Sequence, residues 1–330
     1  MSKLRAGLIG LGAMGRNHRR IMSSLEGVDL VGIADPLGME IDAIKSDECE
    51  IFTDYKELLS RELDYCVISA PTGFHKEIAI RALECGVNCL IEKPVAVNYE
   101  DALEIQKVAQ KQNLLVGIGH IERYNSAIRQ LKRRLESDDL GAIYQISIRR
   151  QGPFPTRIAD VGVVKDLATH DLDLAMWLSG SSFTNINAQT AHRSGREHED
   201  LVSINGLLNN NVIVNLLVNW LSPLKERSLV VTGEKGAYAV DTLNSDLTFY
   251  ENGNHEVSQE AYLHFKGVKQ GNVTTFAFEK PEPLLVEHEN FRDKLLGKEA
   301  DIVTLAEGVE TVRVADAAIQ SSKRGQSITL

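Results

Sequence analysis

The sequence predicts an α/β protein. An N-terminal Rossmann domain, which is a doubly wound parallel sheet, precedes a C-terminal α/β domain with a large, open and mostly antiparallel sheet. Three observations predict this. Short apolar segments alternate with amphipathic ones over residues 4–118, a glycine-rich turn follows the first apolar segment, and longer alternating segments dominate the second half. A chain of 330 residues is also long enough for two domains.

The first half of the chain consists of repeated strand–helix units. The apolar segments do not alternate strictly, which suits strands that are buried on both faces. Helical patterns separate them, as crossover helices separate parallel strands. The predicted strands are 4–9, 28–34, 65–70, 87–91 and 114–118, and the predicted helices are 14–25, 39–46, 55–62, 74–85 and 99–112.

The pattern changes after Gly119, where longer strands with polar alternation replace the short apolar ones. We therefore predict a Rossmann domain over 1–121 and a second domain over 122–330 for substrate binding and oligomerisation, with a closing helix that can pack back on the first domain. The second domain is predicted to contain helices 123–136, 165–178, 282–296 and 303–323, a strand 142–150, a hairpin of 201–208 and 212–220, and a turn 233–236.

One face of the predicted sheet has mixed polarity. Asn215, Asn219 and Ser222 are interspersed there with Ile213 and Leu217. Exposed leucine and isoleucine in a row would leave a sizeable apolar patch on a monomer. We therefore expect this face to pair with another subunit in a homodimer or homotetramer, rather than to be solvated.

Composition limits the possible partners and the compartment. The net charge of −10 argues against nucleic acid or an anionic membrane as a partner, and no segment is long and apolar enough to span a bilayer. No CxxC pair occurs among the four cysteines, so we expect all four to be reduced. Without a recognisable signal peptide, the chain is predicted to be cytoplasmic.

A glycine-rich turn, Gly10-Leu-Gly12-Ala13-Met14-Gly15, follows the first strand and opens the first helix. In this context Gly10 permits the tight turn, Gly12 lets a pyrophosphate approach the backbone, and Gly15 lets the helix pack close to the sheet. The N–H groups of the helix N-terminus then face the phosphates. We predict that residues 10 and 12–15 bind a dinucleotide.

Asp35 ends the second predicted strand, 20 residues after Gly15. A carboxylate at this place accepts hydrogen bonds from the adenosine ribose and repels the 2′-phosphate of NADP. No arginine follows it closely, so the predicted cofactor is NAD. The alternative, a glycine turn with an unrelated surface aspartate, is disfavoured because strand, motif, helix, strand and aspartate occur in the expected order.

The triplet Glu92-Lys93-Pro94 follows the fifth predicted strand. Ligands of open α/β sheets lie beyond the carboxyl ends of the strands, so Lys93 is placed where a substrate meets the nicotinamide. The triplet alone leaves open whether Lys93 is instead a surface lysine in a turn. The bond before Pro94 is a candidate for the cis form.

Asp166 and His170 are four residues apart in a predicted helix, which would place them on one face. A hydroxyl loses its proton as hydride leaves its carbon, and histidine supplies a base with a pKa near neutral. Asp166 could orient the imidazole or the sugar. Acidic residues favoured by a helix N-terminus, or a metal site, are the alternatives. We predict no metal, because hydride transfer to NAD needs none.

Together these motifs resemble the glucose-fructose oxidoreductase / inositol dehydrogenase (Gfo/Idh/MocA) family over essentially the whole chain. The resemblance implies an NAD(P)-dependent dehydrogenase acting on CH–OH groups. It makes Lys93, Asp166 and His170 the catalytic residues, with His170 as acid/base and Lys93 polarising the substrate oxygen. It implies further cofactor contacts from Pro71 and His75, the ends of a Pro-x-x-x-His segment, and from Glu92 and Lys93.

Two stretches, 120–125 and 152–164, resemble UDP-N-acetylglucosamine 3-dehydrogenases, which make a 3-keto sugar nucleotide. Residues 149–165 also contain four basic side chains and one acidic side chain, and this excess of positive charge suits a substrate with a diphosphate. The alternative is that these are chance charges at the solvated end of a strand. The substrate-binding residues expected from these stretches are Arg123, Tyr124, Asn125, Arg157 and Lys165.

Three other functions occur in families of this kind. An inositol or polyol dehydrogenase is the nearest alternative to a sugar-nucleotide dehydrogenase. An NAD-dependent glycosidase is disfavoured by the basic loop, and a non-catalytic, dinucleotide-sensing regulator is disfavoured by the presence of Lys93 and His170.

Overall fold

The computed structural model describes residues 3–37, 49–155, 161–253 and 269–330. The chain forms two compact units, and each is assembled from three segments. The first unit contains Met1–Tyr124, Pro155–Asp173 and Pro281–Asp316, and the second contains Asn125–Phe154, Leu174–Lys280 and Ala317–Leu330. The chain therefore returns twice to the first unit. The single domain boundary after residue 121 stays a prediction.

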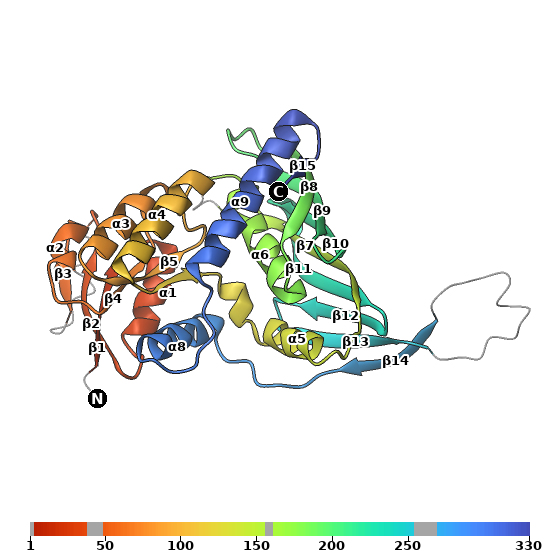
Figure 1. Cartoon of the computed structure of the whole chain (residues 1–330), viewed down its shortest axis with the longest axis horizontal. Helices are drawn as coiled ribbons and strands as arrows, with labels where there is room; N and C mark the ends of the chain where they lie inside the picture. The colour runs from red at the N-terminus through yellow and green to blue at the C-terminus, as the bar shows by residue number, and fades with distance from the viewer. Residues whose placement is uncertain (1–2, 38–48, 156–160, 254–268) are drawn as a thin grey trace, which may run out of the picture. The chain divides into compact units, whose positions relative to one another are not determined.

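The first unit is built on a six-stranded parallel sheet with the strand order β3-β2-β1-β4-β5-β6, which confirms the predicted class (Figure 1). Strands β1 and β2 begin and end where the sequence predicts. Strand β3 was not predicted, because a segment of three residues is too short to show a pattern. The strands are β1 (Leu4–Ile9), β2 (Val28–Ala34), β3 (Glu50–Phe52), β4 (Tyr65–Ile68), β5 (Asn88–Glu92) and β6 (Val116–Gly119).

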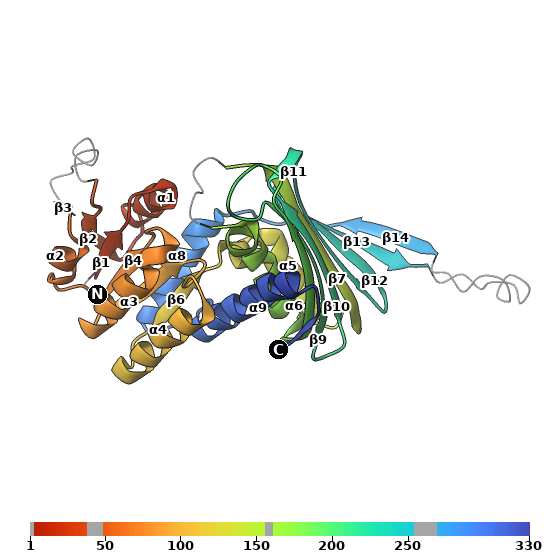
Figure 2. The ribbon, with the colours of Figure 1, turned by 90° about the horizontal axis from the view of Figure 1, so that it is seen from above.

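Helices cover both faces of this sheet, as its apolar strands require (Figure 2). Met22 and Phe291 pack with strand side chains on one face, whereas Leu58, Leu83 and Ile105 pack on the other. The predicted helix 39–46 lies outside the described residues. The helices concerned are α1 (Ala13–Met22) and α8 (Pro283–Leu295) on the first face, and α2 (Tyr55–Leu59), α3 (His75–Glu84) and α4 (Tyr99–Gln112) on the second.

The second unit is built on a nine-stranded sheet with the order β14-β13-β12-β11-β7-β10-β9-β8-β15. Among the described strands of this second sheet only the β7–β10 pair is parallel, so the sheet is mostly antiparallel, as predicted. The predicted hairpin is β9–β10. The strands are β7 (Ile143–Pro153), β8 (Phe183–Ala191), β9 (Leu201–Leu208), β10 (Ile213–Asn219), β11 (Leu221–Gly233), β12 (Gly236–Asp241), β13 (Asp246–Asn252), β14 (Gln270–Thr275) and β15 (Ile328–Thr329).

The turn between β11 and β12 requires glycine. Gly236 has a φ of 156°, and a Cβ there would lie 2.2 Å from the carbonyl oxygen of Tyr250. Strand β10 has two distinct faces, with Val214 and Leu216 buried and Ile213 exposed. The remaining helices are α5 (Ser126–Glu136), α6 (Thr169–Ser179) and α9 (Leu305–Arg324), of which the last two have residues in both units.

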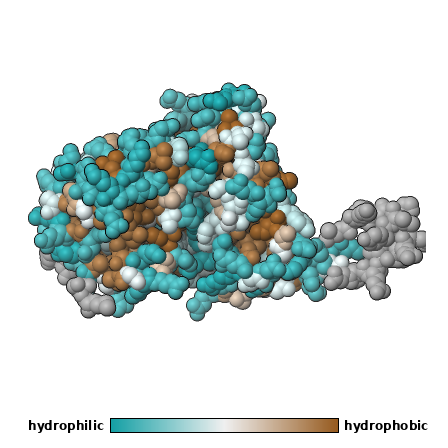
Figure 3. All heavy atoms as spheres, in the orientation of Figure 1, coloured by the Kyte–Doolittle hydropathy of each residue, from teal (hydrophilic) through white to brown (hydrophobic). Residues whose placement is uncertain are grey.

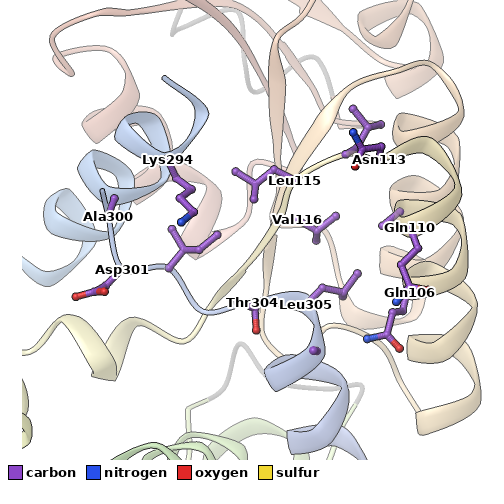
Figure 4. Close-up of a pocket in the computed structure, with 14 residues that line it drawn as sticks. Gln106, Gln110, Asn113, Leu115, Val116, Lys294, Ala300, Asp301, Thr304 and Leu305 are labelled. Atoms are coloured by element: carbon purple, nitrogen blue, oxygen red, sulfur yellow. The ribbon is translucent and has the colours of Figure 1, made fainter. Parts of the chain in front are cut away.

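An open cavity of about 460 Å³ lies in the first unit at the amino end of β6 (Figure 4). Apolar side chains also gather on the surface of the first unit between α4 and α8 (Figure 3). Leu115, Val116 and Leu305 line the cavity together with polar side chains such as Gln106 and Lys294. Substrates of parallel sheets bind at the carboxyl ends of the strands, so we do not assign this cavity to the substrate.

No helix in the described ranges is both long enough and apolar enough to cross a membrane.

Candidate active site

The turn between β1 and α1 cannot accept side chains at two of its glycines. Gly10 has a φ of 92°, and a Cβ there would lie 2.6 Å from the backbone nitrogen of Ala70. A Cβ at Gly15 would lie 2.1 Å from the carbonyl oxygen of Gly10. Because real contacts are longer than this, only glycine lets α1 begin directly beside the carboxyl ends of β1 and β4.

The N-terminus of α1 fits an anionic group. Gly12 is its N-cap and supplies no side-chain hydrogen bond, and the first turn holds no acidic residue. A Cβ at Gly12 would meet no atom of the described residues within 4 Å. Uncapped N–H groups facing open space at the positive end of a helix dipole suit the pyrophosphate of NAD.

Asp35 stands at the end of β2, next to this turn. One carboxylate oxygen accepts a hydrogen bond from the backbone N–H of Leu11 at 2.6 Å, and the other accepts from Leu37 at 2.9 Å. The carboxylate is thus tied to the glycine turn. This position agrees with its predicted role beside the adenosine ribose, which remains a proposal.

Lys93 and Asp166 are in direct contact although 73 residues separate them. The Nζ of Lys93 donates to the carbonyl oxygen of Asp166 at 2.6 Å and to its Oδ1 at 2.9 Å. The second carboxylate oxygen of Asp166 is buried and has no hydrogen-bond partner among the described residues. The structure therefore joins two of the three predicted catalytic residues and leaves one acceptor for a further donor. The Lys93–Pro94 bond is cis, as anticipated.

The helix that carries Asp166 differs from the prediction. Val164–Ala168 forms a π-helical turn, and α6 begins only at Thr169. A π-helical turn is wider than an α-helical one, so the predicted α-helical spacing of Asp166 and His170 is wrong in detail. Such turns are rare and occur frequently at functional sites. The four-residue spacing could not reveal this, because it fits an α-helix equally well.

A second histidine, His120, accompanies His170. The two imidazole rings pack edge to face with centroids 6.2 Å apart. His120 is buried directly after β6, and burial lowers its pKa, only partly opposed by the carboxylate of Asp173. His120 is therefore neutral at physiological pH. The sequence analysis did not select it as a site residue, although its position at the carboxyl end of a parallel strand was a usable signal.

Arg123, predicted to contact substrate, is buried in an internal ion pair. Its guanidinium donates to both carboxylate oxygens of Asp173, at 2.7 and 2.6 Å, and to Glu307 at 2.6 Å. Burial disfavours its charge, but the two carboxylates outweigh burial and raise the pKa of Arg123. These contacts fix α6 to the segment after β6. Its contact with substrate therefore stays a prediction that this internal ion pair does not support.

Three other predicted substrate residues also have partners within the protein. The Tyr124 hydroxyl donates to the carbonyl oxygen of Asp301 at 3.4 Å, and the side chain of Asn125 caps α5 through the N–H of Ala127 at 3.0 Å. Lys165 pairs with Asp316 of α9. All three are buried, so their contact with substrate stays a prediction that this geometry does not support. Arg157 lies outside the described residues.

His75 and Glu92, predicted as cofactor contacts, are turned into the protein. The ring nitrogens of His75 lie 2.9 Å from the carbonyl oxygen of Pro94 and 2.8 Å from that of Ala70, so the ring connects β4 to the Lys93 loop. Glu92 contacts His18 at 2.9 Å. Both side chains are buried and hydrogen-bonded within the protein, so their contact with the cofactor stays a prediction that this geometry does not support. Pro71 is exposed beside a 3₁₀ turn.

Within the described ranges, no group of three histidine, cysteine or acidic side chains converges in a way that could hold a metal ion.

The fold and the glycine turn define an NAD-dependent oxidoreductase. Residues 4–120 match the NAD-binding Rossmann fold of the Gfo/Idh/MocA oxidoreductase family, and residues 132–330 match its C-terminal α/β domain. The chain therefore belongs to the Gfo/Idh/MocA family, which confirms the resemblance described above. The protein binds NAD and acts on CH–OH groups.

Individual relatives have narrower activities. UDP-N-acetylglucosamine 3-dehydrogenase from Acidithiobacillus ferrooxidans is 29% identical over 97% of this chain and 96% of that protein. A solved structure of that enzyme has a TM-score of 0.84 at 26% identity, covering 98% and 99% of the two chains. Inositol 2-dehydrogenase 2 from Saccharopolyspora erythraea is 27% identical over 74% of this chain and 75% of that protein.

A more distant structure shares the fold. The WlbA dehydrogenase from Bordetella pertussis, solved in complex with NADH and UDP-GlcNAcA, has a TM-score of 0.81 at 22% identity, covering 99% of each chain.

The glycine turn leads to a first prediction. Gly12→Ala should leave the melting temperature unchanged, because its Cβ meets no atom of the described residues within 4 Å. The same methyl group would occupy the approach of the pyrophosphate, so the Kd for NADH should rise at least about tenfold, which corresponds to about 1.4 kcal/mol. Differential scanning fluorimetry and NADH fluorescence titration measure the two quantities. An unchanged Kd would contradict the assignment of this turn to the cofactor.

Proposed function

We propose that this oxidoreductase oxidises a secondary ring hydroxyl of a nucleotide sugar, with UDP-N-acetylglucosamine and its C3 hydroxyl as the best candidate. The observation that supports the proposal most strongly is the similarity to UDP-N-acetylglucosamine 3-dehydrogenase along nearly the full length of both chains. Inositol remains the second candidate, because an inositol 2-dehydrogenase is also similar over about three quarters of the chain.

The chemistry requires a base, an oxygen-stabilising group and a hydride acceptor. NAD, when bound, supplies the acceptor through its nicotinamide ring, and Gly10, Gly12–Gly15 and Asp35 are the residues proposed to hold it. His170 takes the hydroxyl proton. Lys93 donates to the substrate oxygen as negative charge develops on it.

Asp166 has two tasks in this mechanism. Its Oδ1 and carbonyl oxygen hold the Lys93 ammonium group in one place. Its buried second oxygen can accept a hydrogen bond from a neighbouring sugar hydroxyl. Fixing both the lysine and the sugar lowers the entropic part of the barrier.

We also propose that the protein is cytoplasmic and forms a homodimer or homotetramer through the open sheet. Leu207 and Ile213 are neighbours on the exposed face of β9 and β10, where Ile213 is 52% exposed. Beside them, Gln145, Asn205 and Asn215 form a hydrogen-bonded polar row. A mixed face of this kind is typical of subunit interfaces.

The substrate proposal predicts that UDP-N-acetylglucosamine, but not myo-inositol, will reduce NAD in the presence of the protein. NADH absorbance at saturating NAD measures both reactions, and mass spectrometry of the product should show the loss of two hydrogens from the sugar nucleotide. Turnover of inositol without turnover of the nucleotide sugar would favour the second candidate.

The catalytic proposal predicts that His170→Ala lowers kcat by about 10²–10⁴-fold, because the base is lost. The Kd for NADH should stay within about twofold, since His170 is not among the residues proposed to hold the dinucleotide. Steady-state kinetics and fluorescence titration measure the two effects. A variant that keeps most of its activity would contradict the role of His170.

The oligomer proposal predicts that Ile213→Glu converts the oligomer to monomers, because a buried and unpaired carboxylate would cost several kcal/mol at the interface. Analytical ultracentrifugation measures the change. Leu296→Glu is the matched control, since Leu296 is also exposed but follows α8 in the first unit. A wild-type monomer would refute the proposal, as would an Ile213→Glu variant with an unchanged mass.

A further inference from the structure

A buried row of polar side chains lies behind Lys93, within the first unit. His18 of α1 has no exposed surface and His288 of α8 is 1% exposed. The Nδ1 of His18 lies 2.8 Å from the Nε2 of His288, and the Nε2 of His18 lies 2.9 Å from Oε1 of Glu92. The proton and hydride transfers proposed above do not involve these two histidines. Because burying a polar side chain costs free energy, the burial of two imidazole rings here needs an explanation.

The row ends on the main chain of the catalytic lysine. The backbone N–H of Lys93 donates to Oε2 of Glu92 at 3.1 Å, while Oε1 of the same carboxylate faces His18. Glu92 pairs in the sheet with Gly119, where a Cβ would lie 3.3 Å from the Glu92 carboxyl carbon. The carboxylate is therefore confined from three sides, by α1, by β6 and by the lysine loop.

We infer that His18, held in turn by His288, is a positioning residue that fixes the Glu92 carboxylate against the backbone of Lys93. The inference deepens the proposed function, because it rests on the role of Lys93 there.

Hydrogen-bond chemistry determines the orientation of the row. A carboxylate only accepts, so the Nε2 of His18 must carry the proton that faces Glu92. Burial lowers the pKa of His288 well below its usual value, with a smaller contribution from the charge of His18. His288 is therefore neutral and holds the ring of His18 through one nitrogen. Its other nitrogen, Nδ1, has no hydrogen-bond partner among the described residues.

The surrounding charges favour an ionised Glu92. Burial alone raises the pKa of Glu92, but the hydrogen bond from His18 and the charges of His18, Lys93 and His75 outweigh burial and lower it. The neighbouring Glu287 of α8 is fully buried, and burial together with the charge of Glu92 raises its pKa well above the usual value. The charge of Glu92 also acts on His120, after β6, and raises its pKa slightly against the larger effect of burial. One of the two buried carboxyls is thus charged and the other is protonated.

The test compares a variant that removes the hydrogen-bond donor of His18 with a variant that keeps a donor at the same position. His18→Leu leaves the Glu92 carboxylate buried without its donor, so its pKa should rise and kcat should fall as the pH decreases through the new value. A displaced Lys93 should lower kcat by about 10²-fold. His18→Gln, whose amide can donate to the same oxygen, should restore most of kcat and the wild-type pH profile.

Two controls separate positioning from a general loss of packing. Met22→Ala removes another buried side chain of α1, a thioether that cannot donate a hydrogen bond to Glu92, and it should lower the melting temperature without moving the pH profile of kcat. In a Glu92→Gln background, His18→Leu should have no further effect on the acid side of that profile. The inference is overturned if His18→Leu keeps the wild-type kcat and profile, or if Met22→Ala reproduces its effects.

A direct measurement separates this inference from the proposed function. In protein with ¹³C-labelled glutamate carboxyls, the Glu92 resonance, assigned by its loss in Glu92→Gln, reports ionisation without any substrate. The wild-type signal should stay that of a carboxylate at neutral pH, and His18→Leu should shift it toward the protonated form. If the wild-type protein oxidises neither candidate sugar, the proposed function fails. If His18→Leu leaves the Glu92 signal unchanged, the inference that His18 positions the Glu92 carboxylate is refuted.

Discussion

The contact between the Lys93 ammonium group and Asp166 is the interaction on which the rest of the site depends. It joins the loop after β5 to a π-helical turn 73 residues later, through two hydrogen bonds of 2.6 and 2.9 Å. Both side chains are nearly buried, so removing either partner would leave an uncompensated charge in a medium of low polarity. Other residues must therefore hold both the Lys93 loop and the Asp166 turn in fixed positions.

Buried polar groups provide that support. Behind Lys93 stand Glu92 and His18, and His75 connects the same loop to the end of β4. On the other side, Arg123 and Asp173 form a bidentate ion pair that fixes α6. Each group is costly to bury alone, and each is compensated by a partner with defined geometry, which gives the site one conformation rather than several.

Sequence patterns predicted the elements that have local causes. The bounds of β1 and β2 follow from apolar runs between turn residues, and the glycine turn was visible in the spacing of Gly10, Gly12 and Gly15 directly after β1. Patterns failed where the element was too short, as in β3. They also could not reveal the internal ion pair of Arg123, because a basic residue in a loop looks the same whether it faces a phosphate or a buried carboxylate.

The sequence by itself indicated the class of protein and, through the family resemblance, the lysine, aspartate and histidine that we propose for the chemistry. The glycine turn and Asp35 likewise indicated where a dinucleotide is proposed to bind. The motifs that carry this resemblance are short, and the spacing within each motif is visible without a structure. Only the tertiary structure decided that Asp166 lies in a π-helical turn, that His120 packs against His170, and that His18 and His288 stand behind Glu92. The two histidine contacts join distant segments whose partners are selected by packing and burial, and the π-helical turn fits the same residue spacing as an α-helix, so no local pattern records these features.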